Sequence, residues 1–306
     1  MNLITPDNII RGLALGVNLL KYRIKKIPYA VNYDLTWQCN LRCKHCYFFS
    51  SANEVEKIKK KELSDEEWIK IFNYHKNLGI FSCSLTGGEP TLRMNLLYEA
   101  VKIFPSVQIA SNGIIKLPPF KNSIKEPIYW VSIDGTEQIH NMIRGANIYE
   151  KVMNNIQNDK RVLISMTINT INYKDIEDTL KEVYSSGVSG LFFLFHTSYN
   201  NDPLLLKGEK LRTAAKNILK VMKDYGDFIL ISKKMLELYI TKEFVPHCIL
   251  KKNDIISYYP NGKKKFCVMG NSELLCENCG CIVPVASYAL SKFDSETVDK
   301  LKKFPF

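Results

Sequence analysis

The feature that most constrains the fold is a regular alternation of short apolar strands and amphipathic helical patterns along the first two thirds of the 306-residue chain. Strand and helix alternate six times, which predicts a parallel sheet covered by helices. Six units are fewer than the eight of a closed barrel of roughly 250 residues. We therefore predict an α/β fold, a partial (β/α)6 TIM-like barrel open along one side. The predicted strands are 29–35, 80–86, 107–111, 128–134, 162–169 and 190–196, and the helical patterns between them include 64–78, 92–103, 138–158 and 176–183.

Changes in pattern divide the chain into three predicted parts. Residues 1–28 carry an apolar stripe at helical spacing beside several Lys and Arg side chains. This N-terminal amphipathic helix either closes one end of the main domain or lies on a membrane surface. Residues 29–243 form the barrel, and near Phe244 the apolar periodicity gives way to lysine and cysteine. Residues 244–306 are predicted to be a small cysteine-rich C-terminal extension.

Composition narrows the cellular setting. The net charge of +11 favours an anionic partner, or reflects a lysine-rich solvated surface. Neither a run of roughly 18 apolar residues nor the pattern of a signal peptide occurs. The expected location is the cytoplasm, with peripheral membrane contact through residues 1–28 as the alternative. In that reducing compartment, cysteines serve as metal ligands rather than in disulfides.

Three cysteines follow the first predicted strand at CxxxCxxC spacing: Cys39, Cys43 and Cys46. This spacing can direct three thiolates into one small volume, whereas a tetrahedral zinc or a cubane iron-sulfur cluster needs four ligands. One ligand position therefore remains open. An open iron of a 4Fe-4S cluster can bind a small chelating molecule, while a structural zinc would be closed by a fourth protein ligand.

Further motifs follow the carboxyl ends of the other predicted strands, the edge of a parallel sheet at which ligands bind. They are Gly87-Gly88-Glu89-Pro90, Ser111-Asn112-Gly113, Ser132-Ile133-Asp134-Gly135, and Thr167 with Asn169. Cys83 differs from these residues, because strand alternation places it with Phe81 and Leu85 on the face toward the helices. We expect Cys83 to be a buried, inert thiol.

The cysteine loop, with His45 at the aromatic position of CxxxCxΦC, resembles the signature of the radical S-adenosylmethionine (SAM) enzymes. Gly87-Gly88-Glu89-Pro90 resembles their GGEP motif, and Ser132 to Gly135 followed by His140 and Arg144 resembles SxDG and HDxxRG, with Asn141 in place of aspartate. The resemblance implies a 4Fe-4S cluster whose open iron binds SAM, and reductive cleavage of SAM to a 5'-deoxyadenosyl radical. A low-potential electron donor such as ferredoxin or flavodoxin would be a partner. The implied SAM contacts are His45, Gly87, Gly88, Glu89, Ser132 near the ribose, Arg144 on the carboxylate, and Asn169.

The C-terminal segment carries a second group of cysteines: Cys248, Cys267, Cys276, Cys279 and Cys281. Two strand patterns around Asn261-Gly262 predict a hairpin over 255–268, and Gly262 stands five residues before Cys267. This arrangement resembles the SPASM or twitch extension of radical SAM enzymes, and more loosely the tail of the adenosyl-hopene transferases. The resemblance implies one auxiliary 4Fe-4S cluster held by Cys248, Cys267, Cys276 and either Cys279 or Cys281. A zinc knuckle is the alternative, because thiolate spacing does not distinguish the two metals.

Three hypotheses about the substrate remain open. SPASM-like extensions and a basic chain suit a peptide or protein substrate. The basic N-terminal helix and the likeness to the hopene transferases favour a lipid or isoprenoid. A zinc-containing, nucleic-acid-binding protein is the non-enzymatic alternative, motivated by five lysines against one aspartate over 251–265. Aromatic RNA-binding signatures are absent from the sequence, so nucleic acid is not the expected partner.

Overall fold

The computed structural model describes residues 24, 26–49, 61–121, 123–270 and 272–302. The predicted N-terminal helix over 1–28 therefore lies almost wholly outside the described residues. Within the described ranges, no helix combines the length and the apolar character needed to cross a bilayer.

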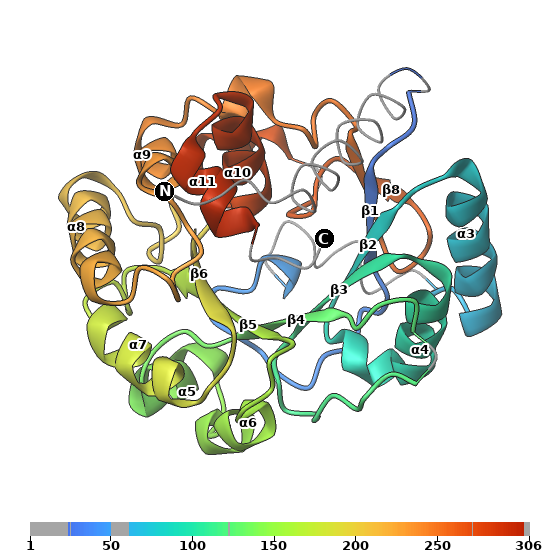
Figure 1. Cartoon of the computed structure of the whole chain (residues 1–306), viewed down its shortest axis with the longest axis horizontal. Helices are drawn as coiled ribbons and strands as arrows, with labels where there is room; N and C mark the ends of the chain where they lie inside the picture. Colours follow the sequence, from blue (N-terminus) through green and yellow to red (C-terminus); the bar gives the residue numbers. More distant parts are fainter. Residues whose placement is uncertain (1–23, 25, 50–60, 122, 271, 303–306) are drawn as a thin grey trace, which may run out of the picture.

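An eight-stranded sheet in the order β6-β5-β4-β3-β2-β1-β7-β8 forms the centre of the molecule (Figure 1). The first six strands are parallel and follow the chain order, which confirms the predicted α/β fold and the partial barrel. Their bounds are β1 (Ala30–Asp34), β2 (Ser82–Thr86), β3 (Ser106–Ser111), β4 (Ile128–Ser132), β5 (Val162–Ile168) and β6 (Gly190–Phe195).

Helices cover the outside of the sheet, as Figure 1 shows for α3 to α8. They are α3 (Asp65–Leu78), α4 (Met94–Ile103), α5 (Glu137–Arg144), α6 (Tyr149–Ile156), α7 (Ile176–Ser185) and α8 (Gly208–Asp224), with short 3-10 turns at η1 (Tyr47–Phe49) and η2 (Pro90–Arg93). A capping box starts α3, since Ser64 and Glu67 exchange hydrogen bonds.

The prediction of one helix over 138–158 is wrong. The chain forms α5 and α6 instead, and α5 ends at Gly145, which has a left-handed φ of 75°. Glycine is the residue that adopts this conformation at low cost, so the helix ends there. The side chain of Asn141 then accepts hydrogen bonds from the backbone amides of Ile148 (2.9 Å) and Tyr149 (3.0 Å), at the start of α6.

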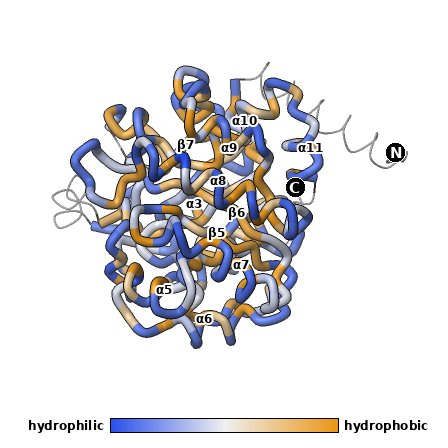
Figure 2. The backbone as a smooth tube through the Cα atoms, turned by 90° about the vertical axis from the view of Figure 1, so that its left-hand side faces the viewer, coloured by the Kyte–Doolittle hydropathy of each residue, from blue (hydrophilic) through white to orange (hydrophobic). Residues whose placement is uncertain are grey.

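The two faces of the sheet differ in polarity. On the outer face, Tyr33 packs against Trp68, Phe72 and Phe104 under α3 and α4. Cys83 is in register with Val31 and is 1% exposed, which confirms the expected buried thiol. The inner face of β1 and β2 carries polar side chains, Asn32 and Asp34 among them. Figure 2 shows hydrophobic segments along β5 and β6 and hydrophilic ones in many outer loops.

After β6 the chain continues along the open side of the barrel. The segment 228–231 pairs with the free edge of β6 through a parallel bridge between Leu191 and Ile229. Helix α9 (Lys233–Thr241) follows, and it packs with two helices that the sequence did not reveal, α10 (Ile282–Ser291) and α11 (Ser295–Leu301). Short 3-10 turns occur at η3 (Val245–His247) and η4 (Glu273–Asn278).

The predicted C-terminal hairpin is present as β7 (Ile255–Tyr258) and β8 (Lys264–Lys265), which are antiparallel and turn at Gly262. Strand β7 also pairs in parallel with β1, so the hairpin extends the barrel sheet. At the other edge, the amide of Phe195 in β6 donates to the carbonyl of Gly280 (3.1 Å). The C-terminal segment therefore reaches both edges of the six-stranded parallel sheet.

Candidate functional site

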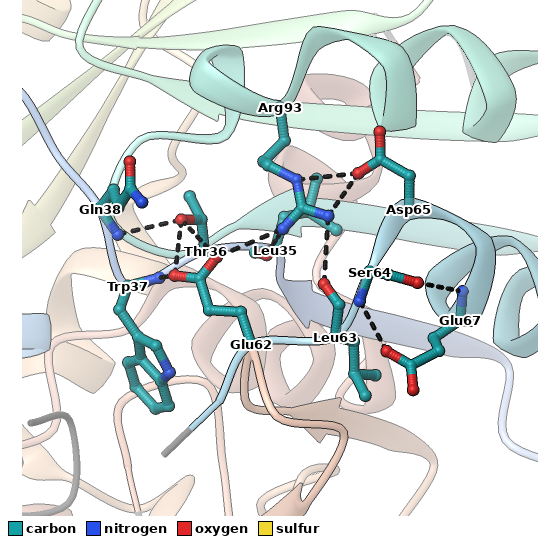
Figure 3. A network of polar contacts seen from close by, with 10 residues as sticks. All are labelled: Leu35, Thr36, Trp37, Gln38, Glu62, Leu63, Ser64, Asp65, Glu67 and Arg93. Carbon is teal, nitrogen blue, oxygen red and sulfur yellow. Dashed lines mark hydrogen bonds and ion pairs between the residues drawn. The ribbon is translucent and has the colours of Figure 1, made fainter. Parts of the chain in front are cut away.

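The loop that carries Cys39, Cys43 and Cys46 begins immediately after β1 and is anchored by Glu62. The Glu62 carboxylate accepts hydrogen bonds from the amide of Trp37 (2.6 Å) and the hydroxyl of Thr36 (2.9 Å), as Figure 3 shows. Trp37 stacks between the rings of Phe48 and Tyr259, the latter from the C-terminal hairpin. These contacts fix the direction in which the chain enters the cysteine loop.

Arg93 at the end of η2 connects this entrance to the neighbouring elements (Figure 3). Its guanidinium bonds to Asp65 at the start of α3 (Nε to Oδ1, 2.9 Å), to Glu62 (Nη1 to Oε2, 3.3 Å) and to the carbonyl of Leu35 (3.3 Å). Sequence reasoning missed both Glu62 and Arg93. Neither belongs to a motif, and their partners lie 25 to 58 residues away in the chain.

Gly87 and Gly88 let the chain after β2 lie against the start of the cysteine loop. The amide of Gly88 donates to the carbonyl of Thr36 (2.9 Å), and the amide of Glu89 donates to that of Gln38 (2.8 Å). A Cβ atom on Gly88 would lie 2.0 Å from the Gln38 carbonyl oxygen. Only glycine fits there, so the paired glycines set the position of the loop.

The Glu89 carboxylate is buried and bonds to groups of its own turn and of the end of β3. It accepts hydrogen bonds from the amide and hydroxyl of Thr91 (3.1 and 2.7 Å), the hydroxyl of Ser111 (2.9 Å) and the amide of Asn112 (2.8 Å). Burial raises the pKa of Glu89, and these donors oppose that effect. In this arrangement Glu89 holds the ends of β2 and β3 together.

The three cysteines of the loop are partly buried. Burial raises the pKa of Cys39 to about 11, and it raises the pKa of Cys43 against the charge of Arg144. The amide of Leu41 donates to the Cys39 sulfur (3.4 Å). A thiol whose pKa is raised in this way needs a bound metal or a nearby cation to become a thiolate.

Asp134 at the end of β4 lies at the centre of a buried charged cluster under the loop. Its Oδ2 atom is 2.6 Å from Nη2 of Arg144 and 3.1 Å from Nε2 of His45. Arg144, on the last turn of α5, also reaches the Cys43 sulfur (Nη1 to Sγ, 3.8 Å). Arg144, followed by His45, holds the pKa of the buried Asp134 carboxyl well below its usual range. Asp134 stood in a motif of the sequence, but only the structure brings it against His45.

The other predicted contacts lie at neighbouring strand ends. Ser132 is half-buried at the end of β4, in register with Ser165 of β5. Asn169 is fully buried after β5, and its Oδ1 accepts a hydrogen bond from the amide of Ile171 (2.8 Å), so its side chain stabilises its own loop. The structure therefore brings the triad, the glycines, Ser132 and Arg144 to one end of the sheet.

A second His-Asp pair lies at this end of the sheet and was missed from the sequence. His196 directly follows β6, and its Nε2 atom is 2.9 Å from Oδ2 of Asp202. Its ring centroid is 6.3 Å from that of His45. Burial lowers the pKa of His196, and Asp202 opposes that shift. A lone histidine and a distant aspartate carry no pattern that reasoning from sequence could have used.

The C-terminal cysteines lie within electrostatic reach of one another. The charge of Cys248 contributes to raising the pKa of Cys267, Cys276, Cys279 and Cys281, although burial is the main cause for each of them. Burial raises the pKa of Cys279 to about 12. Burial, followed by the charges of Asp34, Cys46, Cys281 and Cys267, raises the pKa of Tyr47. Among the described residues, no three His, Cys, Asp or Glu side chains converge as they would around a single metal ion.

The types of donor present suit the cluster and SAM that the sequence motifs imply, although the three loop sulfurs do not converge on one point among the described residues. Three sulfur donors occupy one loop, and Gly87 and Gly88 pack against the start of that loop because a side chain on either would clash with its backbone. Nε of Arg144 and Nδ1 of His45 are buried without a hydrogen-bond partner among the described residues. Buried polar atoms of this kind are normally satisfied, so a bound group is expected to supply their partners.

Comparisons with known proteins agree with this geometry. A family model described as the radical SAM superfamily matches residues 34–183. The sporulation killing factor maturation protein SkfB of Bacillus subtilis is 29% identical over 53% of this chain and 41% of its own length. The Fe-coproporphyrin III synthase of Methanosarcina barkeri is 29% identical over 53% of this chain and 42% of its own length. The chain thus matches less than half of the length of these curated relatives.

Solved structures share the fold. SuiB of Streptococcus suis, bound to its precursor peptide SuiA, superposes with a TM-score of 0.62 at 14% identity. The alignment covers 88% of this chain and 66% of SuiB. SuiB has also been solved bound to S-adenosylmethionine.

Proposed function

Because this chain belongs to the radical SAM superfamily and is an enzyme, we propose that it cleaves SAM reductively and uses the resulting 5'-deoxyadenosyl radical to modify a peptide or protein. The observation that carries the proposal is the close packing of the cysteine loop against Gly87 and Gly88, with Arg144 and Asp134 beneath Cys43. Because the superfamily consists of enzymes, we do not pursue the alternative of a non-enzymatic, zinc-containing nucleic-acid-binding protein.

Each site residue has a proposed role. Cys39, Cys43 and Cys46 ligate a 4Fe-4S cluster, which supplies the electron that splits the sulfonium of SAM. Three further groups bind SAM: the backbone of Gly87 and Gly88 with Glu89 at the amino group, Ser132 at the ribose, and Arg144 at the carboxylate, while His45 and Asn169 line the site. The guanidinium of Arg144 suits a carboxylate, because its donors form a planar fork.

The C-terminal cysteines are proposed to hold one auxiliary 4Fe-4S cluster. The ligands would be Cys248, Cys267, Cys276 and either Cys279 or Cys281. The resemblance of this segment to a SPASM or twitch extension supports a shared site, and a zinc ion remains the alternative occupant. A cytoplasmic location and a low-potential donor such as ferredoxin or flavodoxin complete the proposal.

The peptide substrate is supported by what the relatives are named for. SkfB is a maturation protein of a killing factor, and SuiB binds a precursor peptide. The synthase of Methanosarcina barkeri is matched at the same identity and is named for a porphyrin product, so the substrate class needs its own test. The lipid or isoprenoid hypothesis rests on residues 1–28, which lie almost wholly outside the described residues, and on the looser likeness of the C-terminal segment to the adenosyl-hopene transferases.

Anaerobic reconstitution tests the reaction. The loaded protein should contain iron and should release 5'-deoxyadenosine from SAM when dithionite supplies electrons. Cys43→Ala should abolish this release, whereas Cys83→Ala, which removes a sulfur from the far face of the sheet, should retain it. A colourless protein that contains zinc and no iron after reconstitution would overturn the proposal.

The substrate class is tested by deuterium transfer. If a short peptide gene lies beside this one, its deuterated product should pass deuterium to 5'-deoxyadenosine, and the mass of the peptide should change. Transfer from a deuterated isoprenoid, with none from the peptide, would favour the lipid hypothesis instead. Liposome flotation with and without residues 1–26 then tests the membrane contact.

A further inference from the structure

Asp134 is held rigidly beneath the cysteine loop. It is fully buried, its Oδ1 atom accepts a hydrogen bond from the amide of Thr167 (3.0 Å), and its own carbonyl accepts one from the side chain of Asn172 (2.8 Å). Its Oδ2 atom faces Arg144 and His45 at 2.6 and 3.1 Å. The position of this negative charge is therefore fixed by β4, β5 and the loop that follows β5.

Arg144 places a positive charge against one of the three loop sulfurs. It is 8% exposed, and Nη1 lies 3.8 Å from the Cys43 sulfur. Charges and hydrogen bonds at the ligand sulfurs are among the main determinants of iron-sulfur reduction potentials. A cation at this position favours the reduced state of a cluster, because that state carries one more negative charge. On its own, Arg144 would raise the reduction potential.

The cleavage of SAM requires a potential at the low end of the range for such clusters. We propose that Asp134 is a positioning residue that neutralises Arg144 beside Cys43, and so keeps the potential of the cluster at this loop low while the guanidinium stays in place. The inference rests on the proposed function, because it concerns the cluster of that same site. Solvent screens the pair weakly, since both side chains are buried.

The proposal predicts potential shifts of opposite sign. Asp134→Asn removes the compensating charge and leaves the guanidinium, so the potential should rise. Arg144→Gln removes the cation and leaves the carboxylate, so the potential should fall. The double variant removes both charges and should return toward the wild-type value. If Asp134 and Arg144 had only a structural role, both single variants would shift the potential in the same direction.

The experiment is a redox titration of the reconstituted full chain, followed by the electron paramagnetic resonance signal of the reduced cluster. The signal that is absent from Cys43→Ala belongs to the open-iron cluster, which separates it from any signal of the C-terminal cysteines. Arg144→Lys keeps the positive charge, so its reduction potential should stay near the wild-type value. Glu137→Gln is the matched control, because it removes an exposed carboxylate on the same helix as Arg144.

Shifts of opposite sign, with recovery in the double variant, support the proposal. Shifts in the same direction, or none, would overturn it. If the single variants fail to load iron, loading in the double variant supports charge compensation, and failure in all three variants contradicts it. A wild-type protein without iron would instead count against the proposed function itself.

Discussion

At the scale of single residues, the candidate site depends on a glycine that has no side chain. The missing side chain of Gly88 lets two loops share backbone hydrogen bonds, so that the chain after β2 lies directly against the cysteine loop. A second residue-scale feature is the buried ion pair of Lys265 and Asp34 (2.5 Å), in which the lysine is 1% exposed. Both features lead to predictions.

Gly88→Ala should displace the cysteine loop. The added Cβ atom would lie 2.0 Å from a backbone oxygen that cannot move alone. Iron content after reconstitution should therefore fall severalfold, with little change in the far-ultraviolet circular dichroism. Gly208→Asn is the control, because Gly208 has open space around it and a φ of 52° that asparagine tolerates. Full iron loading by the alanine variant would show that the loop position does not depend on this contact.

Lys265→Met should destabilise the protein by about 3–5 kcal/mol, because it leaves the Asp34 carboxylate buried without its cation. The double variant Asp34→Asn with Lys265→Met should recover most of that loss, since it buries no lone charge. Urea unfolding midpoints of the three proteins measure both effects. Equal losses in the single and double variants would indicate that packing, and not charge pairing, sets the cost.

At the scale of elements, α3 is joined to two strands through one histidine. His75 Nδ1 is 2.8 Å from the hydroxyl of Tyr33 in β1, and Nε2 is 3.4 Å from that of Tyr258 in β7. Burial lowers the pKa of His75 to about 4. The folded protein therefore holds this imidazole neutral at pH values where the unfolded chain, with a pKa near 6.5, binds a proton.

The stability that His75 contributes should be complete above about pH 6.5 and should be lost as the pH falls toward 4, by at most about 3 kcal/mol. The sign follows because the unfolded state binds more protons in this window. His75→Gln should flatten that part of the dependence, leaving the slope due to other buried histidines such as His140, whose pKa burial lowers to about 3. Identical pH dependence in the two proteins would contradict the assignment.

At the scale of the whole molecule, the C-terminal segment contacts both edges of the six-stranded parallel sheet. Hairpin β7–β8 extends one edge through β1, and the chain at Gly280 pairs with the other edge at Phe195. Two further hydrogen bonds support this contact, from Asn278 to the carbonyl of Ser198 (3.1 Å) and from the Gly280 amide to Thr197 (2.8 Å). The segment with three of the five C-terminal cysteines is thus held against β6.

Gly280→Ala should open this contact, because its Cβ atom would lie 1.8 Å from the Phe195 carbonyl oxygen. Hydrogen exchange at the Phe195 and Gly280 amides should accelerate at least tenfold, while exchange at the β2 amides should not change. Protection from exchange that is unchanged at all of these amides would show that the Gly280 contact does not hold the segment against β6.

The predicted domain boundary at 243/244 is tested by unfolding the protein. Two separate unfolding transitions would support the boundary, and one cooperative transition would contradict it.

The sequence alone determined the parts of this protein that follow from local pattern. Strand and helix periods predicted the six parallel strands, and Asn261-Gly262 marked the hairpin. The spacing of Cys39, Cys43 and Cys46 singled out the cysteine loop as the candidate site. Each of these signals lies within a few neighbouring residues. Gly145 marks the break between α5 and α6 in the sequence, but the apolar pattern continues on both sides of it, so one helix was predicted.

Only the tertiary structure decided how distant residues share one site. It joined Glu62 to Trp37, Asp134 to His45 and Arg144, and His196 to Asp202, and it attached the C-terminal hairpin to β1. The physical reason is that burial of charged and polar groups depends on which surfaces the folded chain brings together. A carboxylate at position 134 becomes the partner of a particular guanidinium only once two strands, a helix and the cysteine loop have excluded water around it.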